Sequence, residues 1–152
     1  MQSVFGSAVV ATTLMLVGGC GSKDNGGGAA GGGDPRLEGT YTLVETEMGG
    51  VRSKETEQKG TFAFSGDKMI SPNGKKEEAA TIKCDPSKTP AEITISKTEV
   101  SGKINTFYGI YKLEDDTLTL CLMKSDNPAN RPKEFKTSKE SIVMIEVFKK
   151  TQ

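Results

Sequence analysis

The stretch Ile104–Met123, INTFYGIYKLEDDTLTLCLM, contains two runs of β-branched, aromatic and aliphatic residues on either side of three acidic residues. The first run covers Ile104–Leu113 and has strong strand propensity. In the second run, Thr117–Met123, apolar residues alternate with others, so that Leu118, Leu120 and Leu122 lie on one face. The acidic residues between the runs are typical of a turn. The stretch therefore predicts two antiparallel strands with an apolar face.

Six further short strands are predicted on either side of these two. Glycine, proline, asparagine and aspartate separate them, and no amphipathic helix of convincing length interrupts the pattern. Their expected ranges are Thr40–Thr46, Thr61–Phe64, Lys68–Ser71, Ala80–Cys84, Glu92–Ser96 and Ile142–Lys149. About eight short strands with polar turns predict an all-β fold, an antiparallel sandwich or barrel. The last strand is apolar on both faces, which favours a central or closed position over a solvated edge.

Inward positions of a small barrel either fill a packed core or line one ligand pocket. Alternation along the strands selects eight candidates for the interior: Tyr41, Leu43, Phe62, Phe64, Tyr108, Ile110, Leu118 and Leu120. A cavity above about 300 Å³ would favour ligand binding, and a core without voids would favour a scaffold. The sequence leaves both open.

The amino-terminal segment has a different character. Val4–Val17 is a run of 14 uncharged, largely apolar residues, whereas a membrane-spanning helix needs about 20. A signal-peptide core explains the run better, although the opening residues carry no lysine or arginine. V-G-G-C at Val17–Cys20 resembles a bacterial lipobox. The resemblance implies cleavage before Cys20 and a diacylglycerol on its sulfur, and the alternative is a free cysteine in a disordered tail.

The residues after Cys20 predict a flexible tether. Residues 21–35 are mostly glycine, alanine and small polar residues, which cannot bury enough surface to offset the entropy of ordering. Their mean reach is roughly 20 Å. The expected organisation is a signal peptide over residues 1–19, a lipidated cysteine and linker over 20–36, and one β-barrel domain over 37–152. Gly21 stands where an aspartate would resemble an inner-membrane retention signal, which favours the outer membrane or the cell surface.

Two resemblances concern the predicted barrel. L-E-G-T-Y at Leu37–Tyr41 is similar to the first-strand signature of lipocalins, with Tyr41 in the place of their tryptophan. The chain from about residue 37 to 149 resembles a small lipocalin-like domain family that is abundant in planctomycete bacteria. The motifs that carry this resemblance are L-E-G-T-Y at Leu37, F-S-G-D-K at Phe64, C-D-P-S-K-T-P at Cys84, Y-G-I-Y-K-L at Tyr108, D-T-L-T-L-C at Asp116 and R-P-K-E-F at Arg131. The family implies a β-barrel-like fold in exported proteins and no established activity.

The remaining polar residues argue against catalysis. The chain has no histidine, which removes the commonest general base and metal ligand, so we expect no enzyme, no metal site and no cofactor. Basic and acidic residues balance at 20 each, so we expect no nucleic-acid partner. Cys84 and Cys121 form an even pair that an exported protein could oxidise to a disulfide; two separate buried thiols are the alternative. Arg131, beside a proline, is expected to close one barrel end by binding carbonyls or a carboxylate.

The sequence thus predicts an exported lipoprotein that is held to a membrane through Cys20. Its barrel would bind a small apolar ligand or a peptide. The alternative is a non-enzymatic envelope or surface protein with a solid barrel, whose loops, such as Lys124–Lys139, contact a protein partner.

Overall fold

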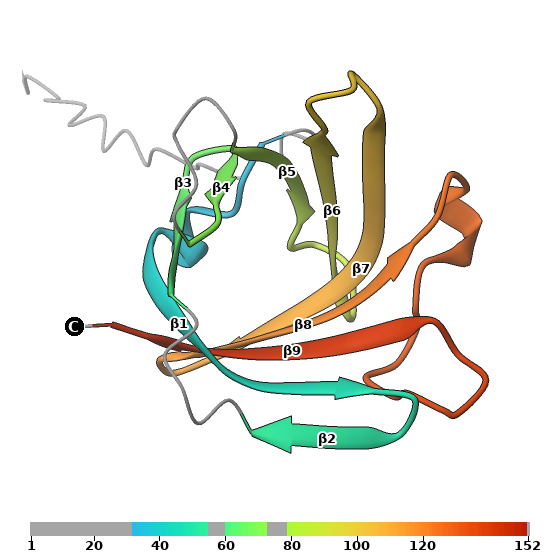
Figure 1. Ribbon diagram of the computed structural model, residues 1–152. Coiled ribbons are helices and arrows are strands. Elements are labelled where there is room, and N and C mark those ends of the chain that lie inside the picture. The colour runs from blue at the N-terminus through green and yellow to red at the C-terminus, as the bar shows by residue number, and fades with distance from the viewer. Residues whose placement is uncertain (1–31, 55–59, 73–78, 152) are drawn as a thin grey trace, which may run out of the picture.

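The first and last strands of the domain pair with each other, and this pairing closes the sheet into a barrel (Figure 1). The structure is a computed structural model that describes residues 32–54, 60–72 and 79–151. Cys20 and the predicted signal peptide lie outside the described residues, as does most of the predicted tether.

Nine strands and two short 3₁₀ helices make up the described chain, without an α-helix in those ranges. Their bounds are η1 Pro35–Leu37, β1 Gly39–Met48, β2 Val51–Lys54, β3 Thr61–Ser65, β4 Lys68–Ile70, β5 Ala80–Asp85, β6 Ala91–Thr98, β7 Ile104–Glu114, β8 Thr117–Lys124, η3 Pro128–Asn130 and β9 Val143–Lys150.

The barrel is an antiparallel ring of eight strands. From β3 to β9 each strand pairs with the next one along the chain, and β1 pairs with both β3 and β9. The predicted all-β antiparallel barrel of eight strands is therefore confirmed. The ninth strand, β2, lies outside the ring and pairs with the second half of β1. It was not predicted, because VRSK is fully exposed and shows no apolar alternation.

Tight turns set the register of two hairpins. Gly49 and Gly50 join β1 to β2 with φ values of 62° and 76°, a conformation that glycine adopts without steric cost. Asp115 joins β7 to β8 with φ 50°, and aspartate is one of the few other residues that tolerate this region. The acidic residues at 114–116 therefore form the turn that the sequence predicted.

A bulge in β1 changes which residues face inward. Leu43 pairs with Phe148, but the next pair joins Glu45 to Val147, so Val44 is an extra residue. Before the bulge, Tyr41 and Leu43 contact the barrel core. After it, Glu45 and Glu47 lie on the outer face with the exposed β2.

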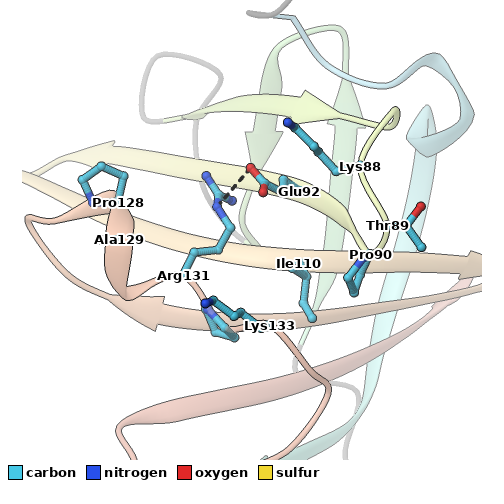
Figure 2. Close-up of a pocket in the computed structure, with 10 residues that line it drawn as sticks. Lys88, Thr89, Pro90, Glu92, Ile110, Pro128, Ala129, Arg131 and Lys133 are labelled. Atoms are coloured by element: carbon cyan, nitrogen blue, oxygen red, sulfur yellow. Dashed lines mark ion pairs between the residues drawn. The ribbon is translucent and has the colours of Figure 1, made fainter.

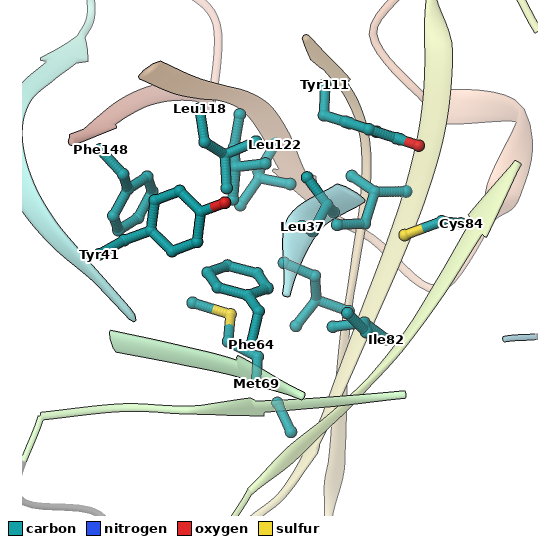
Figure 3. Close-up of a cluster of buried hydrophobic side chains, with 14 residues drawn as sticks. Leu37, Tyr41, Phe64, Met69, Ile82, Cys84, Tyr111, Leu118, Leu122 and Phe148 are labelled. Carbon is teal, nitrogen blue, oxygen red and sulfur yellow. The ribbon is translucent and has the colours of Figure 1, made fainter. Parts of the chain in front are cut away.

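The barrel interior holds one continuous cluster of buried side chains (Figure 3). The buried members are Leu37, Tyr41, Phe64, Met69, Ala80, Ile82, Cys84, Ile93, Ile95, Tyr111, Leu118, Leu120, Leu122 and Phe148. Tyr41 meets Phe64 edge to face with ring centroids 5.4 Å apart. Six of the eight residues expected inside belong to this cluster or pack against it: Tyr41, Leu43, Phe62, Phe64, Leu118 and Leu120.

The expectation for Tyr108 and Ile110 was wrong. On β7 the inward residues are Phe107, Tyr111 and Leu113, which contact the interior cluster. Ile110 instead joins a separate cluster on the outer face of the wall, and Tyr108 also points outward because alternate residues of a strand share a face. The inner and outer faces of β7 were exchanged in the prediction because both faces carry apolar residues.

The segment between β8 and β9 crosses the outer wall of the barrel. Arg131 donates to the carbonyl oxygens of Ile93 and Gly109, at 2.6 Å each. Phe135 packs on the outer cluster that contains Ile110. Farther along, the Thr137 hydroxyl donates to Glu47 at 2.6 Å. This segment, residues 125–142, is called the strap below, because it joins β6 and β7 to β1.

Candidate functional site

A partly open cavity of about 140 Å³ lies inside one end of the barrel. At this end β4, β6 and β8 finish and β5, β7 and β9 begin, and we call it the cavity end. The lining residues are Met69, Ser71, Ala80, Ile95, Lys97, Phe107, Leu122, Met144 and Glu146. Most of them are apolar, as in binding sites for small molecules. This volume is smaller than the about 300 Å³ that would favour ligand binding, but the barrel interior is not free of voids either.

Glu146 is the one acidic residue among the described residues that line the cavity. It lies on β9 between Met144 and Phe148, and it pairs with Leu120 of β8 and Thr46 of β1. Phe148 and Leu120 both belong to the interior cluster, so the carboxyl group projects from an inward-facing row. Burial raises the pKa of Glu146 to about 7 from its usual 4.5. In the described part of the chain no hydrogen bond or ion pair holds this carboxyl group.

Two other polar groups line the cavity. Ser71 follows β4, and Lys97 lies near the end of β6 with an exposed side chain. No ion pair joins Lys97 to Glu146 in the described ranges. The site therefore offers an apolar wall, one carboxyl group and a lysine. The described residues contain no group of three or more metal-ligating side chains.

The opposite end of the barrel is closed by η1, and we call it the η1 end. The Tyr111 hydroxyl donates to Asp34 Oδ2 at 2.6 Å, and Arg36 Nη2 donates to the same oxygen at 2.6 Å. Burial alone would raise the pKa of Asp34, but the hydrogen bonds from Arg36 and Tyr111 lower it below its usual value. Leu37 completes the closure and is 1% exposed. The side chains of Asp34, Arg36 and Tyr111 therefore bind one another at this end of the barrel.

A larger groove of about 660 Å³ lies on the outer wall, between the β5–β6 loop and the strap (Figure 2). Lys88 and Lys133 line it, together with Arg131. Arg131 is held in place by Glu92 at 3.2 Å and by the backbone contacts described above. Arg131 thus binds carbonyl groups and a carboxylate, as the sequence predicted, but it does so at the outer wall and not at an end of the barrel. Among the charged side chains that line the groove, those of Lys88 and Lys133 make no ion pair with any described residue.

The two cysteines of the domain are free and buried. Cys84 belongs to the interior cluster and Cys121 to the outer one, so the wall of the barrel separates their side chains. A disulfide, one of the two alternatives from the sequence, is not formed. Burial raises the pKa of both thiols, which keeps them protonated and unreactive.

No family model matches the chain, and no curated protein or solved structure matches it significantly. Within the described residues, no helix has the length and apolar character needed to cross a membrane.

Sequence reasoning did not single out Glu146, Phe107 or Met144 as site residues. A signal for Glu146 exists: it is the only charged residue within IVMIEVF, a run that is otherwise apolar on both faces. A lone acid in such a strand must face either the barrel interior or the buried outer cluster.

Proposed function

We propose that this chain is an exported lipoprotein whose barrel binds a small, largely apolar molecule at the cavity end. The observation that carries the proposal is the cavity itself, an apolar hollow with a carboxyl group that no described residue engages. A barrel that served only as a scaffold would gain stability from filling this space, because voids cost packing contacts.

The volume of the cavity restricts the ligand. A dry apolar cavity of about 150 Å³ holds one molecule of benzene, and the hollow here measures about 140 Å³. The ligand, or the part of it that enters the barrel, therefore has about six non-hydrogen atoms. A short peptide side chain or a small organic molecule fits this size.

Membrane attachment through Cys20 is the second part of the proposal. It is supported by the uncharged run before V-G-G-C and by the resemblance to a lipobox. The chain enters the barrel at the η1 end, since the Gly32 carbonyl accepts from the Cys84 amide at 2.9 Å. A tether from Cys20 would thus reach the end opposite the cavity and leave the cavity accessible. We place the protein in the cell envelope, at the outer membrane or the surface.

Fatty-acid labelling tests the anchor. Cells given a radioactive fatty acid should label the wild-type chain and leave Cys20→Ser unlabelled, and equal labelling would contradict the lipoprotein proposal.

A cavity-filling variant tests ligand binding. Ala80 lines the cavity, whereas Ala63 of β3 lies on the outer face, between the inward residues Phe62 and Phe64. We expect n-pentanol to shift the NMR signals of Phe107 and Leu122 in the wild type and in Ala63→Leu, and to leave folded Ala80→Leu unaffected. Equal responses in all three proteins, or none in any of them, would contradict binding inside the barrel.

A protein-interaction role is the second candidate, and the outer groove favours it. The groove is large, open and flanked by the free amino groups of Lys88 and Lys133. A photocrosslinker at position 133 should capture a specific envelope protein in cells, whereas the same group at exposed Lys149 should not. Capture at neither position would count against this candidate.

A further inference from the structure

We propose that the ligand of the cavity is a short alkylammonium group, a primary amine on an apolar chain, whose ammonium binds the carboxylate of Glu146. The inference rests on the proposed function and names the chemical class of its ligand.

The position of Glu146 is the first reason. Its inward-facing neighbours include Leu120 on the adjacent strand β8 and Phe148 on β9 itself, both fully buried. A carboxylate in such surroundings loses most of its hydration without gaining a partner among the described residues, which is costly. An apolar residue here would complete the packed interior. A bound cation would compensate the charge and explain why an acid stands in this row.

The shape and polarity of the cavity indicate which cation. A metal ion such as calcium needs six or more oxygen ligands, and the described residues of the cavity lining offer only the Glu146 carboxyl and the Ser71 hydroxyl as side-chain oxygens. An ammonium group needs only a few hydrogen-bond acceptors. The apolar lining formed by residues such as Ile95, Phe107 and Leu122 then suits an alkyl chain.

The opposite ligand charge is disfavoured by the same geometry. A carboxylate ligand would place its charge near Glu146 inside the cavity. Lys97, which lies near the end of β6, could attract such an anion only toward the exposed surface. The location of the two charged groups therefore favours a cation within the barrel.

Binding should depend on pH through Glu146. The groups around it are Leu120 on β8, Thr46 on β1 and, across the cavity, the ammonium of Lys97; Glu45 and Glu47 of β1 face outward. Because burial keeps Glu146 protonated up to about pH 7, an ammonium ligand must displace that proton in more acidic solution. Affinity should rise about tenfold per pH unit below 7 and level off above it.

The experiment compares two probes of equal size, n-pentylamine and n-pentanol, on the full chain at pH 8. Titrations followed by NMR are made with the wild type, Glu146→Gln and Glu140→Gln. Glu140 is exposed in the strap and lies outside the cavity lining. We expect the wild type and Glu140→Gln to bind the amine at least about tenfold more tightly than the alcohol, since a charge-assisted hydrogen bond is stronger than a neutral one. In Glu146→Gln the two probes should bind equally.

The outcomes separate this inference from the proposed function. If the alcohol binds and the amine binds no more tightly to the wild type, the ammonium inference is overturned while ligand binding stands. If pentanoate binds more tightly than the amine, the inference is overturned in favour of an anion near Lys97. If no probe binds, both the inference and the proposed function fail.

Discussion

Replacing Glu146 by glutamine should make the protein more stable at neutral and alkaline pH. The substitution keeps the shape of the side chain and removes its charge. Burial moves the pKa of this carboxyl from the usual 4.5 to about 7 in the folded state. Since each pKa unit corresponds to about 1.4 kcal/mol, the buried charge lowers the free energy of unfolding by about 3 kcal/mol above pH 7.

The sign follows from proton binding. Between pH 4.5 and 7 the folded state holds the proton of Glu146 while the unfolded state has released it, so stability falls as the pH rises through this window. Below pH 4.5 both states are protonated, and above pH 7 both are ionised, so the contribution is constant there. The wild type should therefore lose about 3 kcal/mol relative to Glu146→Gln between pH 4 and pH 8.

Urea unfolding of both proteins at several pH values measures this difference. Other carboxyl groups also titrate, and hydrogen bonds lower the pKa of Asp34 and Glu47. These groups are present in both proteins, so the difference between the two isolates Glu146. Glu140→Gln serves as the control, because this exposed residue should give a difference that does not change with pH. If the free energy of unfolding of Glu146→Gln also differed from that of the wild type by the same amount at every pH, the burial of the Glu146 carboxyl group would be refuted. The argument for a cationic ligand would then be weakened.

Three other predictions concern the η1 end, the strap and the cysteines. Tyr111→Phe should lower the free energy of unfolding in urea by about 1–3 kcal/mol, because buried Asp34 loses a hydrogen-bond donor. Arg131→Ala should increase amide hydrogen exchange within residues 125–135. Arg131→Lys should not restore protection, since lysine lacks the planar guanidinium fork whose separate nitrogen atoms reach the two carbonyl groups and the carboxylate. Reductant should leave the mass of the purified protein unchanged, and the thiols of Cys84 and Cys121 should react with iodoacetamide only after unfolding.

Each of these predictions has a matched control. Tyr41 is also fully buried, but its hydroxyl has no hydrogen-bond partner in the described structure, so Tyr41→Phe should be neutral or stabilising. An equal loss from both tyrosine variants would contradict the role given to Tyr111. Lys133→Ala should leave amide exchange in the strap unchanged. If Arg131→Ala exchanged no faster there than the wild type, the anchoring role of Arg131 would be refuted. A gain of two daltons on reduction would show a disulfide and contradict the placement of the two cysteines.

The strands of the barrel could be predicted because each is short, rich in β-branched or aromatic residues and bounded by turn-forming residues. The turn at Asp115 illustrates this, since local chemistry alone specifies it. β2 could not be predicted in the same way. Its four residues are all exposed, and the strand exists because β1 continues past the bulge and offers a free edge beyond the barrel.

The direction in which a side chain points is harder to predict when both faces of a strand are covered. The strap covers the outer wall with Phe135, so β7 carries Ile110 outward and Tyr111 inward, and both are about 2% exposed. Apolar alternation cannot distinguish the two faces there, and the assignment of Tyr108 and Ile110 to the interior was wrong for that reason. The close packing around Gly109 shows which face of β7 points inward. A Cβ on Gly109 would lie 2.5 Å from a methyl group of Leu122, so the odd-numbered residues of β7 face inward.

The same reasoning explains why the cavity was not located from the sequence. In β9 the apolar residues on both faces predict a covered strand, and Glu146 is the exception in that pattern. Whether a lone acid in such a strand faces an outer cluster or the barrel interior depends on register with β8, which the pairing of Glu146 with Leu120 decides. Leu118, Leu120 and Leu122 were expected to face inward. The pairing of Glu146 with Leu120 therefore suffices to place Glu146 on the inner face of the barrel. The functional proposal for this protein therefore depends on a single register, and the pH dependence of Glu146→Gln is its direct test.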